Sequence, residues 1–459
     1  MSALVVSAAT GGLVPSDPVT STPALVALGV FAVGYLLVML EEVTHLRKSK
    51  PMLIAAGIIW AMVAWDAANL PKLGPHGADH AFRETFLEFA ELFGFLLVAM
   101  TYVNALTERN VFEALRSWLV RRRLGYRAVF WVTGGLAFLL SPVVDNMTTA
   151  LLMGAVVLAV ARANPRFVTL ASINVVVAAN ASGAFSPFGD VTTLMVWQRD
   201  VLPFFTFFYL VVPAVVNWAI PAVIMSLAVP GGIPEGQRDD VRMKLGAKWV
   251  MALFALTITF TVVMRHEVGL PAVYGMLMGL GFLQLFGYFL QRAERRVNDN
   301  GALGQVVPFD IFRQIALVEW DTMLFFYGVI LSVGGLAAFG YLDWVAGHIY
   351  GSWGATAANV AVGVASAVVD NIPIMFAVLT MHPAMDVGQW LLVTMTAGVG
   401  GSLLSIGSAA GVALMGQARG AYTFSGHLKW SWAVALGYAA SILAHQMLNS
   451  GLFTNVPLQ

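Results

Sequence analysis

Two six-residue segments of this chain share the pattern Ser-x-Val-Val-Asp-Asn, at residues 141–146 and 366–371, 225 positions apart. Each sets a carboxylate and an amide in an otherwise apolar stretch, and oxygen atoms of this kind bind small cations. A carboxylate can bind a proton instead. Helix capping would also place Asp or Asn here, but a cap needs no charge. The pattern therefore predicts a cation and proton site formed by Ser141, Asp145, Asn146, Ser366, Asp370 and Asn371.

Two further stretches, residues 181–190 and 400–408, are rich in glycine and serine and interrupt apolar runs. We expect their polar side chains to face the two Asp-Asn segments, although close helix packing also favours small residues. Asp190 aligns with Ser408, so the two halves of such a site would hold three carboxylates between them. The residues predicted to contribute are Asn180, Asp190, Thr192, Thr193, Ser405 and Ser408.

Other acidic residues lie at the ends of apolar runs. Glu91 follows Glu88 at helical spacing, and Glu319 begins the corresponding run in the second half of the chain. Glu91 and Glu319 fit either a proton relay toward the aspartates or carboxylates held in solvent or in structural ion pairs. Asp66 allows a functional or a structural interpretation in the same way. The sequence leaves these alternatives open.

The composition shows where these polar residues must lie. Of 459 residues, 59% are hydrophobic and 11% are charged, whereas soluble chains carry about 25% charged residues. The chain is therefore predicted to be an all-α, multi-pass protein of the lipid bilayer. Zero net charge argues against a nucleic-acid partner, and the absence of cysteine excludes disulfides and thiolate metal sites.

Apolar runs give the expected helices. A membrane-spanning helix needs about 20 apolar residues, and eight runs approach that length, at 24–40, 52–69, 84–106, 203–229, 248–264, 269–290, 318–338 and 431–449. Residues 128–161 and 353–382 each carry an Asp-Asn pair near the middle, which predicts a re-entrant hairpin. Residues 167–198 and 389–417 are predicted to be helices broken halfway across. Together these elements make ten full crossings and two hairpins.

The basic residues test this arrangement, because short cytoplasmic loops collect Lys and Arg. Of the 25 basic residues, four fall in loops assigned to the outside and the remaining 21 fall inside. The four outer residues are Lys72, Arg83, Arg199 and Arg265. Both termini are then predicted to lie on the outer, periplasmic face.

The matching segments imply an internal repeat. The first hairpin would open toward the cytoplasm and the second toward the outside, so the two halves are predicted to be inverted repeats, an architecture typical of secondary transporters. We expect N-terminal helices over 1–83, a first repeat over 84–229, linking helices over 230–317 and a second repeat over 318–459.

Four segments, residues 141–149, 183–197, 368–376 and 400–411, resemble the motifs of the NhaD sodium/proton antiporter family, of the ion transporter superfamily. The similarity covers nearly the whole chain beyond about residue 24. Dicarboxylate/sodium symporters of the same superfamily have Ser-Asn-Thr at their hairpin tips, where this chain has Asp145 and Asp370 in place of the first serine. Fixed negative charge at both tips would repel a dicarboxylate and suits exchange of a cation for protons.

The resemblance implies a secondary transporter of the bacterial inner membrane, a homodimer that moves a transport domain against a scaffold. Na⁺ or Li⁺ would bind at Asp145 and Asp370 in competition with H⁺. These ions would be substrates, and no cofactor is expected. The protein would not be an enzyme.

Three alternatives remain open at this point. An organic-anion, dicarboxylate or arsenite transporter is disfavoured by the carboxylates, and a channel is disfavoured by the inverted repeat. An intramembrane aspartyl protease would need Gly-x-Gly-Asp and a Tyr-Asp partner. In this chain Pro187-Phe188 precedes Gly189-Asp190, and the sequence contains no Tyr-Asp dipeptide.

Overall fold

The computed structural model describes residues 20–70, 73, 77–122, 124–161, 164–233, 241–299, 308–454 and 456–458. All regular elements in these ranges are helices. Six of the described helices are long and apolar enough to cross a membrane, spanning Thr22–Met39, Gly77–Glu108, Phe204–Ala228, Ala247–Val268, Ala272–Arg295 and Trp320–Ala338. The all-helical membrane fold expected from the composition is confirmed.

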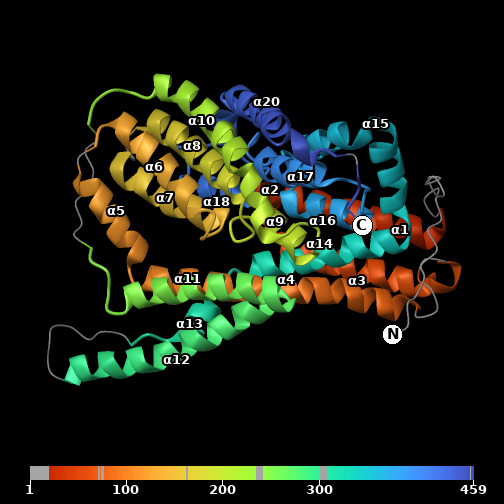
Figure 1. Ribbon diagram of the computed structural model, residues 1–459, viewed down its shortest axis with the longest axis horizontal. Coiled ribbons are helices and arrows are strands. Elements are labelled where there is room, and N and C mark those ends of the chain that lie inside the picture. The colour runs from red at the N-terminus through yellow and green to blue at the C-terminus, as the bar shows by residue number, and fades with distance from the viewer. Residues whose placement is uncertain are drawn as a thin grey trace.

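One group of helices forms the lower part of Figure 1, with its helix α1 (Thr22–Met39) at about mid-height. It contains α1, α3 (Ser49–Trp65), α4 (Gly77–Glu108), α11 (Ala247–Val263), α12 (Ala272–Asp299), α13 (Ile311–Ala316) and α14 (Trp320–Ala338). Helix α14 packs against α3 and α4, and α12 packs against α11 and α4. We call this group the lower helices. Helix α4 begins at Gly77, so the predicted repeat boundary at residues 83 and 84 falls inside a continuous helix.

The first predicted hairpin is a pair of helices joined by a short turn. Helix α6 (Tyr126–Leu140) and helix α7 (Asn146–Ala161) pack side by side, with residues 141–145 between them. In the second pair, α15 (Tyr341–Ala365) is longer than predicted and is joined to α16 (Asn371–Met381) by residues 366–370. Helix α15 is kinked at Gly354, where φ is 74° and ψ is 159°. The predicted start of this hairpin, residue 353, therefore coincides with the kink.

Both predicted broken helices are interrupted where glycine and serine gather. Helix α8 (Pro165–Gly183) and helix α9 (Val191–Gln198) are separated by residues 184–190. Helix α17 (Val387–Gly400) and helix α18 (Ala409–Gln417) are separated by residues 401–408. Helices α10 (Val211–Ala228) and α20 (Ser431–Leu448) pack on each other beside α8 and α17. With the two hairpins these elements form the upper part of Figure 1, which we call the upper helices.

Each hairpin turn lies against one helix break, in matching fashion. The hydroxyl of Ser141 donates to the carbonyl oxygen of Ala179 at 2.8 Å, and that of Ser366 donates to the carbonyl oxygen of Ala397 at 2.7 Å. Backbones approach so closely that a Cβ added to Gly407 would lie 2.7 Å from the carbonyl oxygen of Ser366. Glycine at the break is therefore required by the contact with the turn.

Three further short helices lie in the connections between the longer ones. They are α2 (Glu41–Thr44), α5 (Val111–Arg121) and α19 (Phe424–Leu428). Helix α5 packs against both α4 and α7, so it links the lower helices to the first hairpin. It lies at one end of the molecule in Figure 1, opposite the C-terminus.

Candidate ion-binding site

The carboxylate of Asp190 lies where both hairpin turns meet the first helix break. Asp190 is only 4% exposed and caps α9, accepting a hydrogen bond from the Thr192 amide at 3.0 Å. The side-chain amide of Asn146, at the first turn, donates to it at 3.1 Å. The amide of Asn371, at the second turn, donates to it at 3.3 Å. One carboxylate thus joins two turns whose asparagines are 225 positions apart in sequence.

Asn180 connects the first break to the second. Its amide oxygen accepts a hydrogen bond from Asn146 at 3.1 Å. Its amide nitrogen donates to the hydroxyls of Ser402 at 2.8 Å and Ser408 at 3.0 Å. All three are fully or almost fully buried. Ser402 was not predicted as a site residue, although it lies within the Gly-Gly-Ser stretch that marked the second break.

Asp145 and Asp370 flank this cluster without hydrogen-bonding to Asp190. Asp145 has a positive φ of 40° in the turn, and its Oδ1 accepts a hydrogen bond from the Thr148 amide at 2.8 Å. The backbone amide of Asp370 donates to the Tyr35 hydroxyl at 3.1 Å. The Oδ1 atom of Asp370 is buried and has no hydrogen-bond partner among the described residues. An unpartnered buried carboxylate oxygen fits a position for a cation or a proton.

The other predicted hydroxyl residues divide into two kinds. The Oγ1 atom of Thr192 is buried without a partner in the described part of the chain, so it is available to a ligand. Thr193 donates to the Gly183 carbonyl at 3.4 Å, and Ser405 contacts the Met415 sulfur at 3.7 Å. Ser141 and Ser366 already bond helix carbonyls. The structure thus brings Asn146, Asn180, Asp190, Asn371 and Ser408 together, and gives Ser141, Ser366, Thr193 and Ser405 other partners.

A cavity of about 60 Å³ opens beside this cluster, between the upper and the lower helices. Asp145, Asn146, Asp190 and Asn371 line one side, and residues of α4 and α14 such as Phe326 line the other. Because a water molecule occupies about 30 Å³ of liquid, the space suits a small cation with a water molecule. Most of the surface that lines the cavity is apolar. The positive charge of a cation in the cavity would therefore have to be balanced by the carboxylates.

The two predicted relay carboxylates lie in different places. Glu319 precedes α14 and accepts a hydrogen bond from Thr322 at 3.1 Å, and its charge acts on Asp145. The side chain of Lys48 attracts both Glu319 and Asp370. Glu319 therefore lies close enough to Asp145 and to Lys48 for their charges to interact.

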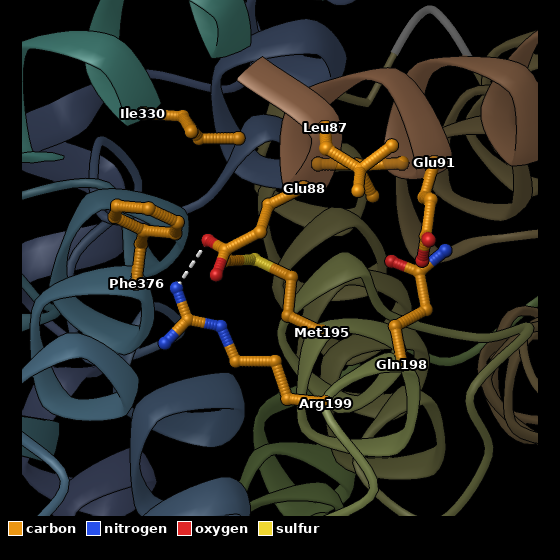
Figure 2. A pocket seen from close by; sticks show the side chains of 9 residues that line it. Leu87, Glu88, Glu91, Met195, Gln198, Arg199, Ile330 and Phe376 are labelled. Carbon is orange, nitrogen blue, oxygen red and sulfur yellow. Dashed lines mark hydrogen bonds and ion pairs between the residues drawn. The ribbon is translucent and has the colours of Figure 1, made fainter. Parts of the chain in front are cut away.

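Glu91 lines a separate cavity of about 100 Å³ and is not part of the Asp190 cluster. Figure 2 shows its side chain directed toward Gln198, next to an ion pair between Glu88 and Arg199. The Arg199 guanidinium also lies 4.9 Å from the ring centre of Phe376. The ion pair joins α4 to the end of α9, and the contact with Phe376 adds α16. Sequence analysis predicted only that Arg199 lies in an outer loop.

Asp66 has a structural role in this arrangement. Helix α3 ends at Trp65, and Asp66 follows it outside the span. Hydrogen bonds from the Ser21 hydroxyl and the Asn69 amide lower the pKa of Asp66. It remains charged at neutral pH and ties the start of α1 to the end of α3.

A buried carboxylate between two helical hairpins and two broken helices, within a bundle of membrane-length apolar helices, defines a multi-pass membrane transporter. Comparison with known proteins gives the family. Residues 19–398 match the family model described as CitMHS, citrate transporter. The Na(+)/H(+) antiporter NhaD of Halomonas elongata is 51% identical over 451 residues, covering 95% of this chain and 91% of that protein.

Two other relatives give the same result. The NhaD antiporter of Alkalimonas amylolytica is 52% identical, covering 96% of this chain and 93% of its own length. That of Vibrio cholerae is 52% identical, covering 95% and 94%. The chain belongs to the NhaD family of antiporters, as the sequence motifs predicted.

Proposed function

We propose that this protein exchanges Na⁺ or Li⁺ for H⁺ across the bacterial inner membrane, with Asp145, Asp190 and Asp370 binding either the cation or protons. The observation that carries the proposal is the contact of the Asp190 carboxylate with both hairpin turns. The names of the relatives, all Na(+)/H(+) antiporters, support the choice of ions.

Competition for the carboxylates would couple the two fluxes. In the structure, the amide nitrogens of Asn146 and Asn371 donate to the Asp190 carboxylate. A cation entering the cavity needs oxygen ligands, which requires these side chains to turn their amide oxygens inward. Protonation of a carboxylate removes the charge that holds the cation. Glu319, and Glu91 on the other side, would relay protons to the cluster.

Transport also requires the site to face each side of the membrane in turn. The cavity between the upper and lower helices suggests that the upper helices move as one body, in an elevator-type motion, against the lower helices as scaffold. The matching Ser141 and Ser366 contacts support the inverted repeat that such a motion uses. We propose a homodimer with both termini on the periplasmic face. Residues 1–19 lie outside the described part of the chain.

An organic anion, citrate or another dicarboxylate, is a weaker candidate despite the description of the family model. Two carboxylates, those of Asp145 and Asp190, line the cavity, and no basic side chain lines it among the described residues. An aspartyl protease is a weaker candidate still, because its catalytic aspartate would pair with a second aspartate. The hydrogen-bond donors to Asp190 are instead two side-chain amides and a backbone amide.

Proton flux in proteoliposomes tests the proposal. We expect Na⁺ and Li⁺ to drive proton movement in the wild-type protein, whereas K⁺ and a dicarboxylate do not. Asp145→Asn and Asp370→Asn should each abolish the exchange. Retention of Na⁺-driven exchange in both variants would show that the site is assigned wrongly. Proton movement driven by the dicarboxylate would show that the substrate is assigned wrongly.

A further inference from the structure

A buried histidine, His427, makes hydrogen bonds that end at the second helix break. It lies in α19, and its side chain is 0% exposed. Its Nε2 atom lies 3.0 Å from the carbonyl oxygen of Ser402, and its Nδ1 atom lies 2.7 Å from the hydroxyl oxygen of Tyr422. Ser402 is one of the two hydroxyl residues that hold Asn180 in the ion site. His427 therefore reaches the ion site through one intermediate residue.

The partners of His427 determine which ring nitrogen carries the proton. A carbonyl oxygen can only accept a hydrogen bond, so Nε2 must donate to Ser402. The Nδ1 atom of the neutral ring then accepts a hydrogen bond from the Tyr422 hydroxyl. Burial lowers the pKa of His427 to about 4, so the ring is neutral at physiological pH. The ring is thus a donor directed at one carbonyl and held in place by a second residue.

The first helix break shows why the second needs this donor. Ala184 lies 218 positions before Ser402, the spacing that aligns the two breaks, and its carbonyl oxygen accepts a hydrogen bond from the Thr193 hydroxyl at 3.4 Å. The residue that corresponds to Thr193 is Gly411, which has no hydroxyl. A Cβ at Gly411 would lie 2.2 Å from a backbone carbonyl oxygen, so no side chain fits there. His427 supplies from outside the break the hydrogen bond that Thr193 supplies within the first one.

Holding the Ser402 carbonyl also determines where the Ser402 hydroxyl lies. This hydroxyl accepts a hydrogen bond from the amide nitrogen of Asn180 at 2.8 Å. The same bond directs the amide oxygen of Asn180 toward Asn146 and the Asp190 cluster. If Ser402 moved, the amide of Asn180 could turn over and present its nitrogen to the cluster. A cation needs oxygen ligands, so the orientation of this amide affects cation binding.

We infer that His427 is a positioning residue of the ion site, which holds Ser402 so that the amide oxygen of Asn180 faces the transported cation. The inference rests on the proposed exchange of Na⁺ or Li⁺ for H⁺ at this cluster. His427 acts through Ser402 and Asn180 and does not bind the cation itself. Its loss should therefore weaken cation binding without stopping the exchange.

A second histidine, His445, offers a matched control. It too is fully buried, with Nε2 at 2.9 Å from the carbonyl oxygen of Gly388 and Nδ1 at 2.8 Å from the amide nitrogen of Asn449. Gly388 lies in the first turn of α17, at the opposite end of that helix from the break at Ser402. The two histidines therefore make the same kind of hydrogen bond at different ends of one helix.

The test measures Na⁺-driven proton flux in proteoliposomes and separates the KM for Na⁺ from the maximal rate. His427→Leu removes the donor, and we expect the KM to rise about 5- to 10-fold, the effect of one buried hydrogen bond, with the maximal rate within about twofold. His427→Gln keeps an N–H near the position of Nε2, so its KM should stay within about twofold of the wild type. Tyr422→Phe, a milder change that removes the donor to Nδ1, should raise the KM about threefold. His445→Leu should lower the unfolding temperature about as much as His427→Leu does and leave the KM unchanged.

A double-mutant cycle tests the route through Ser402. Ser402→Ala should itself raise the KM for Na⁺, and adding His427→Leu should raise it by less than about twofold more, because both changes remove the same support from Asn180. Multiplied effects of the two changes would overturn the inference, and so would an equal rise in His445→Leu. An unchanged KM in His427→Leu, or in Tyr422→Phe should the leucine variant not fold, would overturn it as well. Absence of Na⁺-driven flux from the wild-type protein would instead contradict the proposed exchange.

Discussion

Asp190 has two roles at the residue scale, and the chain offers a way to separate them. It caps α9 and also accepts hydrogen bonds from both hairpin turns. Asp386 caps α17 in the same way, accepting from the Gln389 amide at 2.8 Å. It lies at the opposite end of α17 from the helix break, about 20 Å away at 1.5 Å per residue. The two aspartates share a local geometry and differ in their distance from the cluster.

Asp190→Asn and Asp386→Asn should therefore behave differently. Asparagine caps a helix about as well as aspartate, so each variant should keep its unfolding temperature within a few degrees of the wild type. Loss of charge at residue 190 removes charge-assisted contacts to the cation, and we expect Na⁺-driven proton flux to fall roughly 100-fold. Asp386→Asn should retain wild-type flux. Equal flux in the two variants would show that Asp190 only caps α9 and does not bind the transported ions.

At the scale of elements, the contact between each turn and its helix break limits which side chains fit. A Cβ at Gly407 would lie 2.6 Å from the carbonyl oxygen of Ala367, which is backbone and cannot move aside cheaply. Gly416, in α18, has nothing within 4 Å of the same position. Glycine-to-alanine substitution at the two sites therefore compares a close contact with open space.

Gly407→Ala should lower the free energy of unfolding by about 1–3 kcal/mol, the usual cost of overpacking, and should weaken Na⁺ binding because the second turn shifts. Gly416→Ala should leave stability unchanged or raise it by up to about 1 kcal/mol, as expected for an exposed helix position. Thermal unfolding with and without Na⁺ measures both effects. A Gly407→Ala protein as stable as the wild type would mean that turn and break are not in contact.

The ion pair between Glu88 and Arg199 bridges the lower and upper helices on the side of the site that is predicted to be outer (Figure 2). If the upper helices move, this pair must break. Glu88→Gln removes the ion pair and should favour the conformation in which the upper helices have moved relative to the lower helices. The shift in this equilibrium should be at most about fivefold, because a partly exposed ion pair contributes up to about 1 kcal/mol. Met195 lines the cavity beside this ion pair. A single cysteine introduced there, Met195→Cys, should then react faster with a maleimide. The chain has no native cysteine to interfere.

Asp79→Asn is the matched control, because it breaks an exposed ion pair with Arg83 inside α4 alone. It should leave the labelling rate of the residue 195 cysteine unchanged. The same acceleration in both variants would mean that the Glu88 pair does not hold two groups of helices together.

The sequence predicted those features of the fold and the site that depend on residues close together in the chain. The helix breaks and hairpin turns followed from motifs such as Ser141–Asn146 and from the repeat. Ser402 and Tyr35 were missed because their contacts, with Asn180 and with Asp370, span 222 and 335 residues. Arg199 was counted as an outer-loop charge, because no local pattern shows its pairing with Glu88. Local motifs predicted the elements, whereas tertiary packing decided which polar groups meet.

At the scale of the whole molecule, the orientation in the membrane rests on charge. The loops at the α5 end are basic, and the predicted inside contains 21 of the 25 basic residues. The first hairpin turn is approached from that end and the second from the other, so orientation also decides which hairpin opens to the cytoplasm. A reversed molecule would place these basic loops on the outer side of the membrane.

Two single cysteines test this orientation. Glu267 is 68% exposed between α11 and α12 and is predicted outside, whereas Arg419 is exposed and predicted inside. A membrane-impermeant maleimide should label Glu267→Cys in intact cells, and should label Arg419→Cys only in inside-out vesicles. Labelling in the reverse order would place the first hairpin opening on the periplasmic side. Proton entry through Glu319 would then start from the outside, and the direction of exchange would have to be reassigned.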